Sequence, residues 1–318
     1  MTLLLAIDGG GTRTRCIAVD RDGGRRGEGE AGPSNHLHVP LVTATAALRS
    51  ATAAALSAAG AAIADVAMVS AGLAGVDFDG SGAEDAARML RSIGFDRVVV
   101  HGDMLVAHRG ALAGAPGVVA LAGTGSSVLG IAADATMIKA GGWGPLYGDQ
   151  GSAYQLGRLG LVAAAAAFDG SGAATLLVDR LTRAVGVSRF PDTVARLYSD
   201  LAGQQHVSSL APVVDACAEE GDEVAAAICR RAGDDLARVV LAVARRLPAV
   251  DRRVSHQGAV LGRSKLVRAS FLGALEAEGL ELEVQPPRFE PIVGAALLGA
   301  HAAGWRLALE GLEVPHGV

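Results

Sequence analysis

Short apolar runs that end at an acid or a glycine recur along the chain and predict buried strands followed by tight turns. The first run covers residues 3–7 and stops at Asp8, and a continuous apolar run of this length is typical of a strand buried on both faces. Three glycines follow at residues 9–11, where glycine permits a tight turn because it reaches positive φ at no steric cost. Thr12 closes the turn and residues 15–19 form a second strand, so the pattern predicts a β-hairpin with a glycine tip.

The same periodicity and glycine breaks predict an α/β chain in two parts. In the first part we expect strands at residues 25–31, 66–71 and 97–101, and helices at residues 40–59, 83–92 and 104–112. The stretch Gly-Ala-Pro-Gly at residues 114–117 is the predicted linker. It separates an N-terminal domain, residues 1–115, from a C-terminal domain, residues 116–318.

The second part opens with the same pattern as the first. A strand at residues 118–122, a glycine turn at 123–126 and a returning strand at 128–132 favour an internal duplication, although two unrelated hairpins would give the same pattern. About five helices should follow between residues 152 and 247. The remaining expected elements are a strand at 253–257, a glycine turn at 258–264, a helix at 265–278, an edge strand at 281–285 and a final helix at 291–309.

The first hairpin has the features of a phosphate site. A turn without side chains lets a ligand touch backbone N–H groups, and such nests favour phosphates. The acid Asp8 is unfavourable there unless a cation lies between the two charges, and Mg²⁺ is bound in this way by one or two carboxylates plus phosphate oxygens. The alternative is an ordinary glycine-rich hairpin with a surface acid. The second hairpin favours phosphate, because both turns combine glycine with Thr or Ser.

Composition and charge exclude several other classes of protein. The 318 residues predict about two domains, and with half of the residues hydrophobic but only 3% aromatic the cores must consist of Ala, Val and Leu. The net charge of −5 and the absence of a basic block argue against a nucleic-acid partner. The first apolar run has no basic leader, so we expect no signal peptide. No uncharged apolar run is long enough for a membrane helix, so we expect no membrane partner.

Common side-chain motifs for metals, phosphates and hydrolysis are absent from the sequence. Cys16, Cys217 and Cys229 form no CxxC pair and fit a reducing, cytoplasmic compartment. Neither Lys139 nor Lys265 lies in a GxxxxGK[ST] loop, which excludes a Walker-type nucleotide site, and the motifs GxSxG and HExxH do not occur. A phosphate ligand would therefore be held by backbone amides and a metal.

The glycine-rich residues 141–152 form a candidate sugar site. They contain Trp143 and Tyr147 and then Asp149, just before a predicted helix. A sugar ring can stack on an aromatic plane, and a carboxylate accepts hydrogen bonds from hydroxyl groups. Capping of the following helix is the alternative role of Asp149.

Five motifs occur in an order that resembles one protein family. They are DGGGT at residues 8–12, GPSNH at 32–36, Gly-Asp at 102–103, GTGS at 123–126, and Gly-Trp-Gly before Gly-Asp-x-Gly-Ser within 142–152. The ordered set resembles the BadF/BadG/BcrA/BcrD-type branch of the actin-like ATPase superfamily, and within it the N-acetylglucosamine kinases. The likeness covers residues 3–299, and residues 258–264 resemble the adenosine loop of the family. Gln150 and Ala259 stand where Glu and a second glycine are usual.

The resemblance implies two ribonuclease H-like domains around a central cleft, with the last helix packed back on the N-terminal domain. It implies ATP and Mg²⁺ as cofactors and an amino sugar as substrate, with Asp8 near the metal and Asp103 as the catalytic base at the C6 hydroxyl. The implied ATP contacts are Gly9, Gly10, Gly11, Thr12, Gly123, Thr124, Gly125, Gly258, Leu261 and Ser264. The implied sugar contacts are Asn35, His36, Asp103, Ser126, Gly142, Trp143 and Asp149.

Other functions of the same fold stay open at the level of sequence. Glucosamine could replace N-acetylglucosamine as the sugar, because the discrimination depends on a few atoms around C2. An ATPase activator of a reductive dehydratase would hold an iron–sulfur cluster with cysteines at a subunit contact, and the three dispersed cysteines argue against it. A non-enzymatic sugar sensor would not need the intact Asp8 and Asp103. The sequence does not determine the oligomeric state, and a homodimer is one option.

Overall fold

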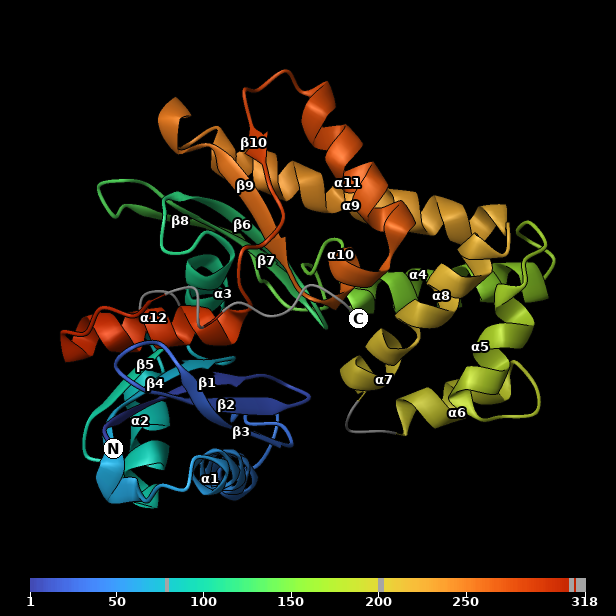
Figure 1. Cartoon of the computed structure of the whole chain (residues 1–318). Helices are drawn as coiled ribbons and strands as arrows, with labels where there is room; N and C mark the ends of the chain where they lie inside the picture. Colours follow the sequence, from blue (N-terminus) through green and yellow to red (C-terminus); the bar gives the residue numbers. More distant parts are fainter. Residues whose placement is uncertain (78–79, 200–202, 309–311, 313–318) are drawn as a thin grey trace. The chain divides into compact units, whose positions relative to one another are not determined.

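The structure is a computed structural model that describes residues 1–77, 80–199, 203–308 and 312 (Figure 1). Its internal contacts divide the chain into two compact units. Unit 1 consists of Met1–Pro116 and Pro286–Val318, and unit 2 consists of Gly117–Gln285. The chain therefore leaves unit 1 once and returns to it near its C-terminal end. A single division of the chain at residue 115 does not include this return.

Unit 1 is built on a five-stranded sheet in the order β3-β2-β1-β4-β5. β1 is antiparallel to β2 and parallel to β4, and β5 continues the parallel part. The apolar run at the start of the chain is the central strand, with Leu3 to Ile7 fully buried, as its pattern predicts. The strands are β1 (Leu3–Gly9), β2 (Thr14–Val19), β3 (Arg25–Ala31), β4 (Val66–Leu73) and β5 (Val98–Gly102).

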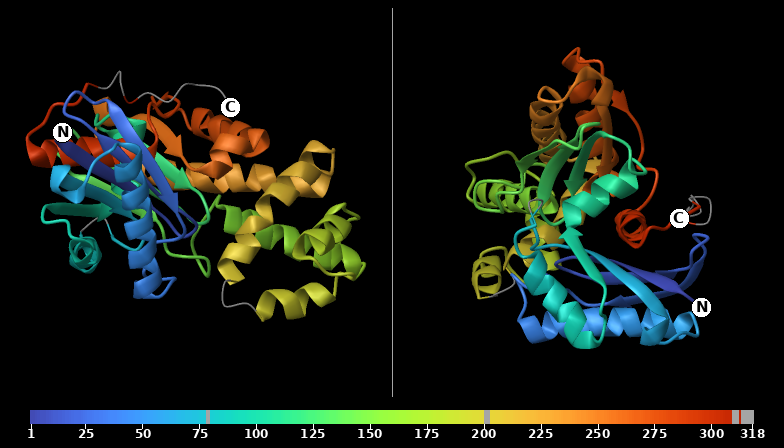
Figure 2. Two further views of the ribbon diagram at one scale, coloured as in Figure 1. Left: turned by 60° about the horizontal axis from the view of Figure 1, so that its bottom comes forward. Right: turned by 90° about the vertical axis from the view of Figure 1, so that its left-hand side faces the viewer.

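Helices cover both faces of this sheet (Figure 2). Leu3, Leu5 and Ile7 pack with residues of α1 (Leu41–Ala58) and α2 (Ala83–Ile93) on one face. Leu4 and Ala6 point to the other face, where they pack with α3 (Asp103–Ala111) and α12 (Pro291–Ala303). Because side chains alternate along a strand, Asp8 continues the stripe that faces α12.

α12 approaches its neighbours closely through glycine. A Cβ atom at Gly294 would lie 1.9 Å from the Val106 carbonyl oxygen of α3, and one at Gly299 would lie 2.6 Å from Ser70 Cβ of β4. α12 also ends earlier than the predicted helix at 291–309, because Gly304 at φ +70° terminates it after Ala303. Leu309, the predicted last residue, lies outside the described residues.

One described helix, α1, has the length and hydropathy of a membrane span. Its seven buried residues, however, face the sheet of unit 1, and the helix carries Arg49. The apolar stripe of α1 is thus accounted for by packing against the sheet, as in the core helix of a globular domain.

Unit 2 repeats the strand order of unit 1. Its sheet runs β10-β9-β6-β7-β8, with β6–β7 and β7–β8 antiparallel and β6–β9 and β9–β10 parallel. Read outward from β6, these directions match those of unit 1 read outward from β1, so the duplication expected from the glycine turns is present in the topology. The strands are β6 (Gly117–Ala122), β7 (Ser126–Ile131), β8 (Met137–Gly141), β9 (Arg253–Gln257) and β10 (Glu283–Val284).

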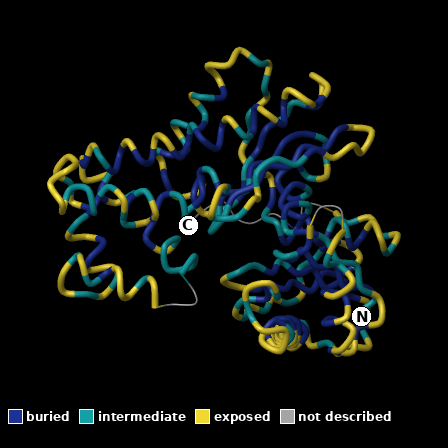
Figure 3. The backbone as a smooth tube through the Cα atoms, turned by 180° about the vertical axis from the view of Figure 1, so that it is seen from behind, coloured by how far each residue is buried: buried dark blue, intermediate teal, exposed yellow. Residues whose placement is uncertain are grey.

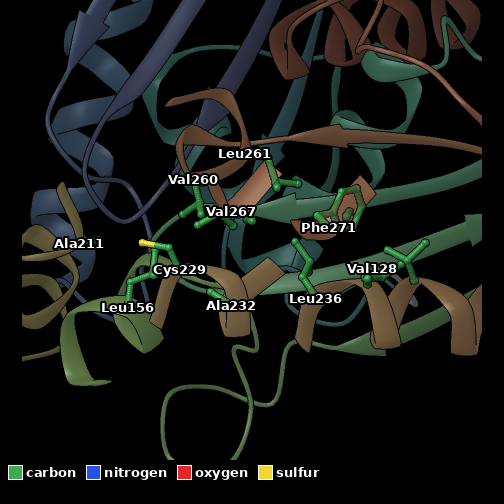
Figure 4. Packing of buried hydrophobic residues seen from close by; sticks show 14 of the residues in the cluster. Val128, Leu156, Ala211, Cys229, Ala232, Leu236, Val260, Leu261, Val267 and Phe271 are labelled. Atoms are coloured by element: carbon green, nitrogen blue, oxygen red, sulfur yellow. The ribbon is translucent and has the colours of Figure 1, made fainter. Parts of the chain in front are cut away.

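The core of unit 2 lies between its sheet and two long helices (Figure 4). Val128 of β7 meets Leu236 and Phe271, which come from two helices that approach closely at Gly233, where a Cβ would lie 2.4 Å from the Val267 carbonyl oxygen. The helices of unit 2 are α4 (Ala153–Phe168), α5 (Leu177–Val185), α6 (Asp192–Tyr198), α7 (Gly203–Ser209), α8 (Ala211–Glu219), α9 (Glu223–Ala244), α10 (Ala259–Arg263) and α11 (Lys265–Ala277). Figure 3 shows that burial concentrates on the strands and on the inner faces of the helices.

Two predicted elements of unit 2 are different in the structure. Residues 258–264, predicted as a glycine turn, contain the short helix α10, and only Gly258 has left-handed backbone geometry, at φ +100°. β8 was not predicted, because Met137–Gly141 is short and only one of its residues, Ile138, is buried.

Candidate functional site

The glycine tip in unit 1 is a tight turn in which Gly10 N donates to the Arg13 carbonyl at 2.9 Å. Positive φ is not the reason for its first two glycines, since neither Gly9 nor Gly10 adopts it. Gly9 is required by close packing instead, because a Cβ there would lie 2.3 Å from Ser34 Oγ and 2.5 Å from Leu73 Cδ2. Gly11 and the exposed Thr12 complete the tip.

We expect Gly9→Ala to destabilise unit 1 by about 1–3 kcal/mol, because a methyl group would force Ser34 and Leu73 apart in a packed region. The measurement is urea unfolding followed by circular dichroism. Gly32→Ala is the matched control, since a Cβ at Gly32 meets nothing within 4 Å. Equal free energies of unfolding for the two variants would mean that the tip accommodates the methyl group without loss of stability.

The loop that carries Asn35 is tied to this tip. The N–H groups of Ser34 and Asn35 donate to the Gly10 carbonyl oxygen at 3.1 and 3.3 Å. Asn35 is 7% exposed, and its Oδ1 accepts from Leu37 N at 3.1 Å. A Cβ at Gly75, after β4, would lie 2.8 Å from Asn35 Oδ1 and 3.3 Å from His36 Cε1. Three loops therefore meet at one edge of the sheet, and they bring Asn35 and His36 to the glycine tip.

Two acids lie at this same edge. Asp8 is at the end of β1, and the parallel register aligns it through Gly72 of β4 with His101 of β5. Asp103 follows two residues later as the first residue of α3, where its Oδ1 accepts from Met104 N at 2.8 Å. The carboxyl ends of parallel strands meet at one edge of a sheet, so the strand–acid pattern of the sequence places both carboxylates together.

The negative charge of Asp103 acts on Asp8. Burial, and then the negative charge of Asp103, raise the pKa of Asp8 from its ordinary value of 3.8 to about 6. Arg15 and Arg13 lower this pKa, and Glu290 raises it. The charges of two other acids and two arginines thus act on Asp8, and proton uptake or a cation would relieve the repulsion between the carboxylates.

The acids fit a divalent cation. The described residues contain no group of three or more His, Cys, Asp and Glu side chains that could hold a metal by themselves. Mg²⁺ does not require one, because it is usually bound by one or two carboxylates together with phosphate oxygens and water. Burial and the charge of Asp103 raise the pKa of Asp8 in spite of two nearby arginines, so a bound cation would stabilise the ionised carboxylate.

The corresponding edge of unit 2 holds the second glycine turn. Gly123 N donates to the Gly125 carbonyl at 2.9 Å, and the first N–H groups of α4 donate to the turn, Ala153 to Gly123 O at 2.9 Å and Tyr154 to Thr124 O at 3.1 Å. The turn and the beginning of α4 therefore form one rigid element.

Asp149 supports this turn from within unit 2. It is 4% exposed with φ +57°, and its Oδ1 accepts from Ser126 N at 3.1 Å. A Cβ at Gly125 would lie 2.9 Å from the same oxygen. Burial raises the pKa of Asp149. The helix-cap alternative for Asp149 is wrong, because Ser152 caps α4 by accepting from Gln155 N at 3.1 Å.

The loop before Asp149 contains exposed aromatic side chains. Gly142, at φ +72°, donates its N–H to the Ser126 carbonyl at 3.0 Å, so the loop begins beside the glycine turn. Trp143 is 65% and Tyr147 71% exposed, so large apolar side chains gather at the surface of this one short loop. Unit 2 thus brings together Ser126, Gly142 and Asp149, whereas Asn35, His36 and Asp103 belong to unit 1.

The predicted adenosine loop, residues 258–264, can offer backbone groups rather than side chains to a ligand. Gly258 lies against the end of β6, where a Cβ would be 2.3 Å from the Ala122 carbonyl oxygen, next to the glycine turn. Leu261 is fully buried in the core (Figure 4). Ser264 Oγ accepts from Val267 N at the start of α11 and donates to Asp215 Oδ1. ATP contacts by the side chains of Leu261 and Ser264 therefore do not fit the structure, because both side chains are engaged in packing and capping.

Sequence reasoning missed several charged residues near the two turns. Arg13 lies in the turn of the first hairpin and Arg15 on its returning strand β2, and their position next to the glycine tip in the sequence could have revealed them. Glu290 lies 275 residues from Arg15, with which it forms an ion pair at 3.0 Å, and no local pattern reveals that contact. In unit 2, Gln155 of α4 accepts from Gly151 N and donates from Nε2 to Asp235 Oδ2 at 2.7 Å, so it connects the loop before α4 to α9.

Comparisons with known proteins agree with this architecture. The chain is 28% identical over 303 residues to the N-acetylmuramic acid/N-acetylglucosamine kinase of Clostridium acetobutylicum, covering 94% of this chain and 98% of the relative. It is 27% identical over 315 residues to the N-acetyl-D-glucosamine kinase of Dictyostelium discoideum, with the same two coverages.

Solved structures share the fold over nearly the whole chain. A candidate N-acetylglucosamine kinase from Chromobacterium violaceum superposes with a TM-score of 0.75 at 26% identity, covering 94% of this chain and 99% of that one. A ROK family glucokinase from Streptomyces griseus, at 17% identity and a TM-score of 0.59 with the same coverages, shares the fold. The model of the BadF/BadG/BcrA/BcrD ATPase family matches residues 5–299, and the chain belongs to this family.

Proposed function

We propose that the protein is a sugar kinase that transfers the γ-phosphate of ATP to the C6 hydroxyl of N-acetylglucosamine. The observation that carries the proposal is the pair Asp8 and Asp103 beside the glycine tip of unit 1. Phosphoryl transfer needs a metal-binding carboxylate, a base for the attacking hydroxyl and backbone donors for phosphate oxygens. The names of the two curated relatives supply the sugar.

Asp103 is the general base in this proposal. Its carboxylate would accept the proton of the C6 hydroxyl over a hydrogen-bond distance of ~2.6–3.2 Å. Its position at the start of α3 supports the role, because the helix holds the carboxylate at a defined place while one oxygen is fixed by Met104 N. Loss of the proton makes the sugar oxygen a better nucleophile as the bond to phosphorus forms.

Asp8 would hold Mg²⁺, which neutralises charge on the transferred phosphate when it is bound. The two glycine turns, Gly9 to Thr12 and Gly123 to Gly125, would bind phosphate oxygens through backbone amides other than Gly10 N and Gly123 N, which donate to carbonyl groups within the turns. Their side-chain-free surface and fixed geometry suit close approach by an anion. Gly258 extends this backbone surface in unit 2, where the adenosine part of ATP would lie.

The sugar contacts in the proposal are Asn35, His36 and Asp103 from unit 1, and Ser126, Gly142, Trp143 and Asp149 from unit 2. Asn35 Oδ1 already accepts from Leu37 N, and Nδ2 lies 3.4 Å from His38 Nδ1, so the second N–H of Nδ2 is the group that would donate to a sugar hydroxyl. The remaining oxygen of Asp149 would accept from a hydroxyl, since only Oδ1 is bonded to Ser126 N.

We expect Asn35→Asp to raise KM for the sugar about 10-fold or more while leaving KM for ATP nearly unchanged. The variant keeps the oxygen that fixes Leu37 N but loses the Nδ2 donor, and a hydrogen bond lost from a buried site costs about 1–3 kcal/mol. Steady-state kinetics with each substrate varied will measure this. Equal changes in both KM values would indicate that the loop has been disturbed and that Asn35 is not a specific sugar contact.

Sugar binding should change the fluorescence of Trp143, because this exposed indole would be covered by a sugar ring. Trp305 is the second tryptophan of the chain and gives the background signal. The sugar response should therefore vanish in Trp143→Phe and persist in Trp305→Phe. A response unchanged in Trp143→Phe would remove Trp143 from the sugar site.

The alternative of an iron–sulfur ATPase activator is disfavoured by the cysteines. Cys16 is buried in β2 of unit 1, whereas Cys217 and Cys229 are buried in unit 2. Burial raises the pKa of each thiol, to about 12 for Cys229, which opposes the thiolate form that binds iron. Iron analysis and a visible spectrum of anaerobically purified protein distinguish the two functions.

The experiment that tests the proposed function is a coupled ADP-release assay with a panel of sugars: N-acetylglucosamine, glucosamine, N-acetylmuramic acid and glucose. We expect the highest kcat/KM with N-acetylglucosamine and no activity when EDTA exceeds the metal. Highest kcat/KM with glucosamine would make glucosamine the substrate in place of N-acetylglucosamine. Sugar binding without ADP release would favour a non-enzymatic sugar sensor. We also propose that the enzyme is cytoplasmic, because its cysteines are free. We further propose a homodimer, which analytical ultracentrifugation will test.

A further inference from the structure

Arg15 faces Asp8 but does not pair with it. The two residues are direct partners in the antiparallel register of β1 and β2, so their side chains lie on the same face of the sheet with Cβ atoms ~4.5–5.5 Å apart. An arginine opposite an aspartate would ordinarily form a cross-strand ion pair. No ion pair between Arg15 and Asp8 is present among the described residues, and the Arg15 guanidinium instead contacts Glu290, with Nη1 3.0 Å from Oε2.

Glu290 is held rigidly in the position that makes this contact. It immediately precedes α12, and a Cβ at Gly110 would lie 2.4 Å from its carbonyl oxygen. Phe289 N donates to the Gly110 carbonyl at 3.2 Å, so the segment is anchored to α3, the helix that begins with Asp103. The Glu290 side chain makes no capping hydrogen bond to α12, which leaves its carboxylate to Arg15.

We propose that Glu290 is a positioning residue, which holds the Arg15 guanidinium away from Asp8 and thereby keeps the Asp8 carboxylate available to the divalent cation. This inference rests on the proposed function, in which Asp8 binds the metal. Without Glu290, the acids opposite Arg15 in the strand register are Asp8 of β1 and Glu30 of β3. Glu30 is exposed, whereas Asp8 is partly buried and the charge of Arg15 already reaches it. A guanidinium paired with that carboxylate would compete with the cation for the same oxygens.

The partial burial of the pair makes the effect measurable. The Arg15 side chain is 19% exposed and that of Glu290 38%, so water screens their interaction less than that of a fully exposed pair. The charges of Arg13, Arg15, Asp103 and Glu290 all reach Asp8. Arg13 is exposed at the hairpin tip and is not restrained by Glu290, so it remains a constant background in the comparison of variants.

The test is a titration of Mn²⁺ with ADP present, followed by electron paramagnetic resonance of free Mn²⁺. We expect Glu290→Gln to weaken Mn²⁺ binding about tenfold, as for one positive charge moved to a neighbouring carboxylate. The double variant Glu290→Gln/Arg15→Gln should recover wild-type affinity to within about twofold, since the competing guanidinium is then absent. Arg15→Gln alone should bind Mn²⁺ at least as tightly as the wild type, and it provides the test if Glu290→Gln does not fold.

Glu220→Gln is the matched control, because it breaks a similar ion pair, Arg180–Glu220 at 2.6 Å, in unit 2. It should leave Mn²⁺ affinity unchanged. The KM for Mg²⁺ in turnover should rise in Glu290→Gln, with the KM for the sugar unaffected.

Two results would overturn the inference while leaving the proposed function intact. Wild-type Mn²⁺ affinity in folded Glu290→Gln would mean that Glu290 does not restrain Arg15. A double variant as weak as Glu290→Gln would mean that Glu290 acts through the fold or on the metal directly. Failure of the wild type itself to bind Mn²⁺ with ADP and to phosphorylate any sugar would instead overturn the proposed function.

Discussion

Asp103→Asn should reduce kcat by ~10²–10⁴-fold while sugar and ATP still bind, because the amide retains the size of the acid but cannot take a proton. The local fold should survive the change. Asp103 Oδ1 accepts from Met104 N at 2.8 Å, and the amide oxygen of Asn can accept the same bond. The loss should therefore fall on kcat rather than on KM, since a base acts in the transition state and contributes little to ground-state binding.

Two other roles of Asp103 predict different results for this variant. If Asp103 only starts α3, Asn would serve equally well and turnover would persist. If it only orients the sugar, KM would rise and kcat would hold. Calorimetric sugar binding and steady-state rates on the same sample separate these cases. Turnover near the wild-type rate in Asp103→Asn would place the base elsewhere in the chain.

Asp8→Asn should abolish activity and at the same time make the folded protein more stable at neutral pH. The pKa of Asp8 is raised from 3.8 to about 6 in the folded state, so the fold binds this proton more tightly than the unfolded chain. Ionisation of Asp8 therefore lowers stability as the pH rises from about 4 to 6, and the loss is complete above that range. Asn carries no charge, so the variant should be more stable by about 1–3 kcal/mol at pH 8 and gain less at pH 5.

Urea unfolding of both proteins at pH 5, 6, 7 and 8 will measure this difference. Asp65→Asn is the control with the opposite sign, because a hydrogen bond from Ala62 N lowers the pKa of Asp65 and stabilises its ionised form. Its effect on stability should be constant between pH 5 and 7. An Asp8→Asn variant that is less stable than the wild type at pH 8 would show that groups of the protein already stabilise the ionised carboxylate. That result would contradict a role of Asp8 as a metal ligand.

The sequence predicted the parts of the fold that local patterns control. The apolar run of β1, the alternation of β3 over Arg25–Ala31 and the two strand–glycine–strand units are set by residues close together in the chain, and each is present. The local pattern was misleading at residues 259–263, where Gly258 and Gly262 favour a turn. Burial of Val260 and Leu261 against unit 2 stabilises a helix there instead of a turn.

The candidate site was predictable where an acid or a glycine turn follows a strand. Asp8 and Asp103 end or follow parallel strands, so topology alone places them at one edge. The contact of Asp149 with Ser126 N and the ion pair of Glu290 with Arg15 depend on tertiary packing between distant segments. The role of glycine also differed from expectation, since Gly9 is required by the proximity of Ser34 and not by its backbone angle.

The most direct test of the proposed reaction is the structure of its product. The protein is incubated with ATP, Mg²⁺ and N-acetylglucosamine, and ¹H, ¹³C and ³¹P nuclear magnetic resonance identifies the phosphorylated carbon. We predict one equivalent of N-acetylglucosamine 6-phosphate for each ADP formed, with none from Asp103→Asn. Phosphate at C1, or ADP formed at the same rate without sugar, would contradict the account.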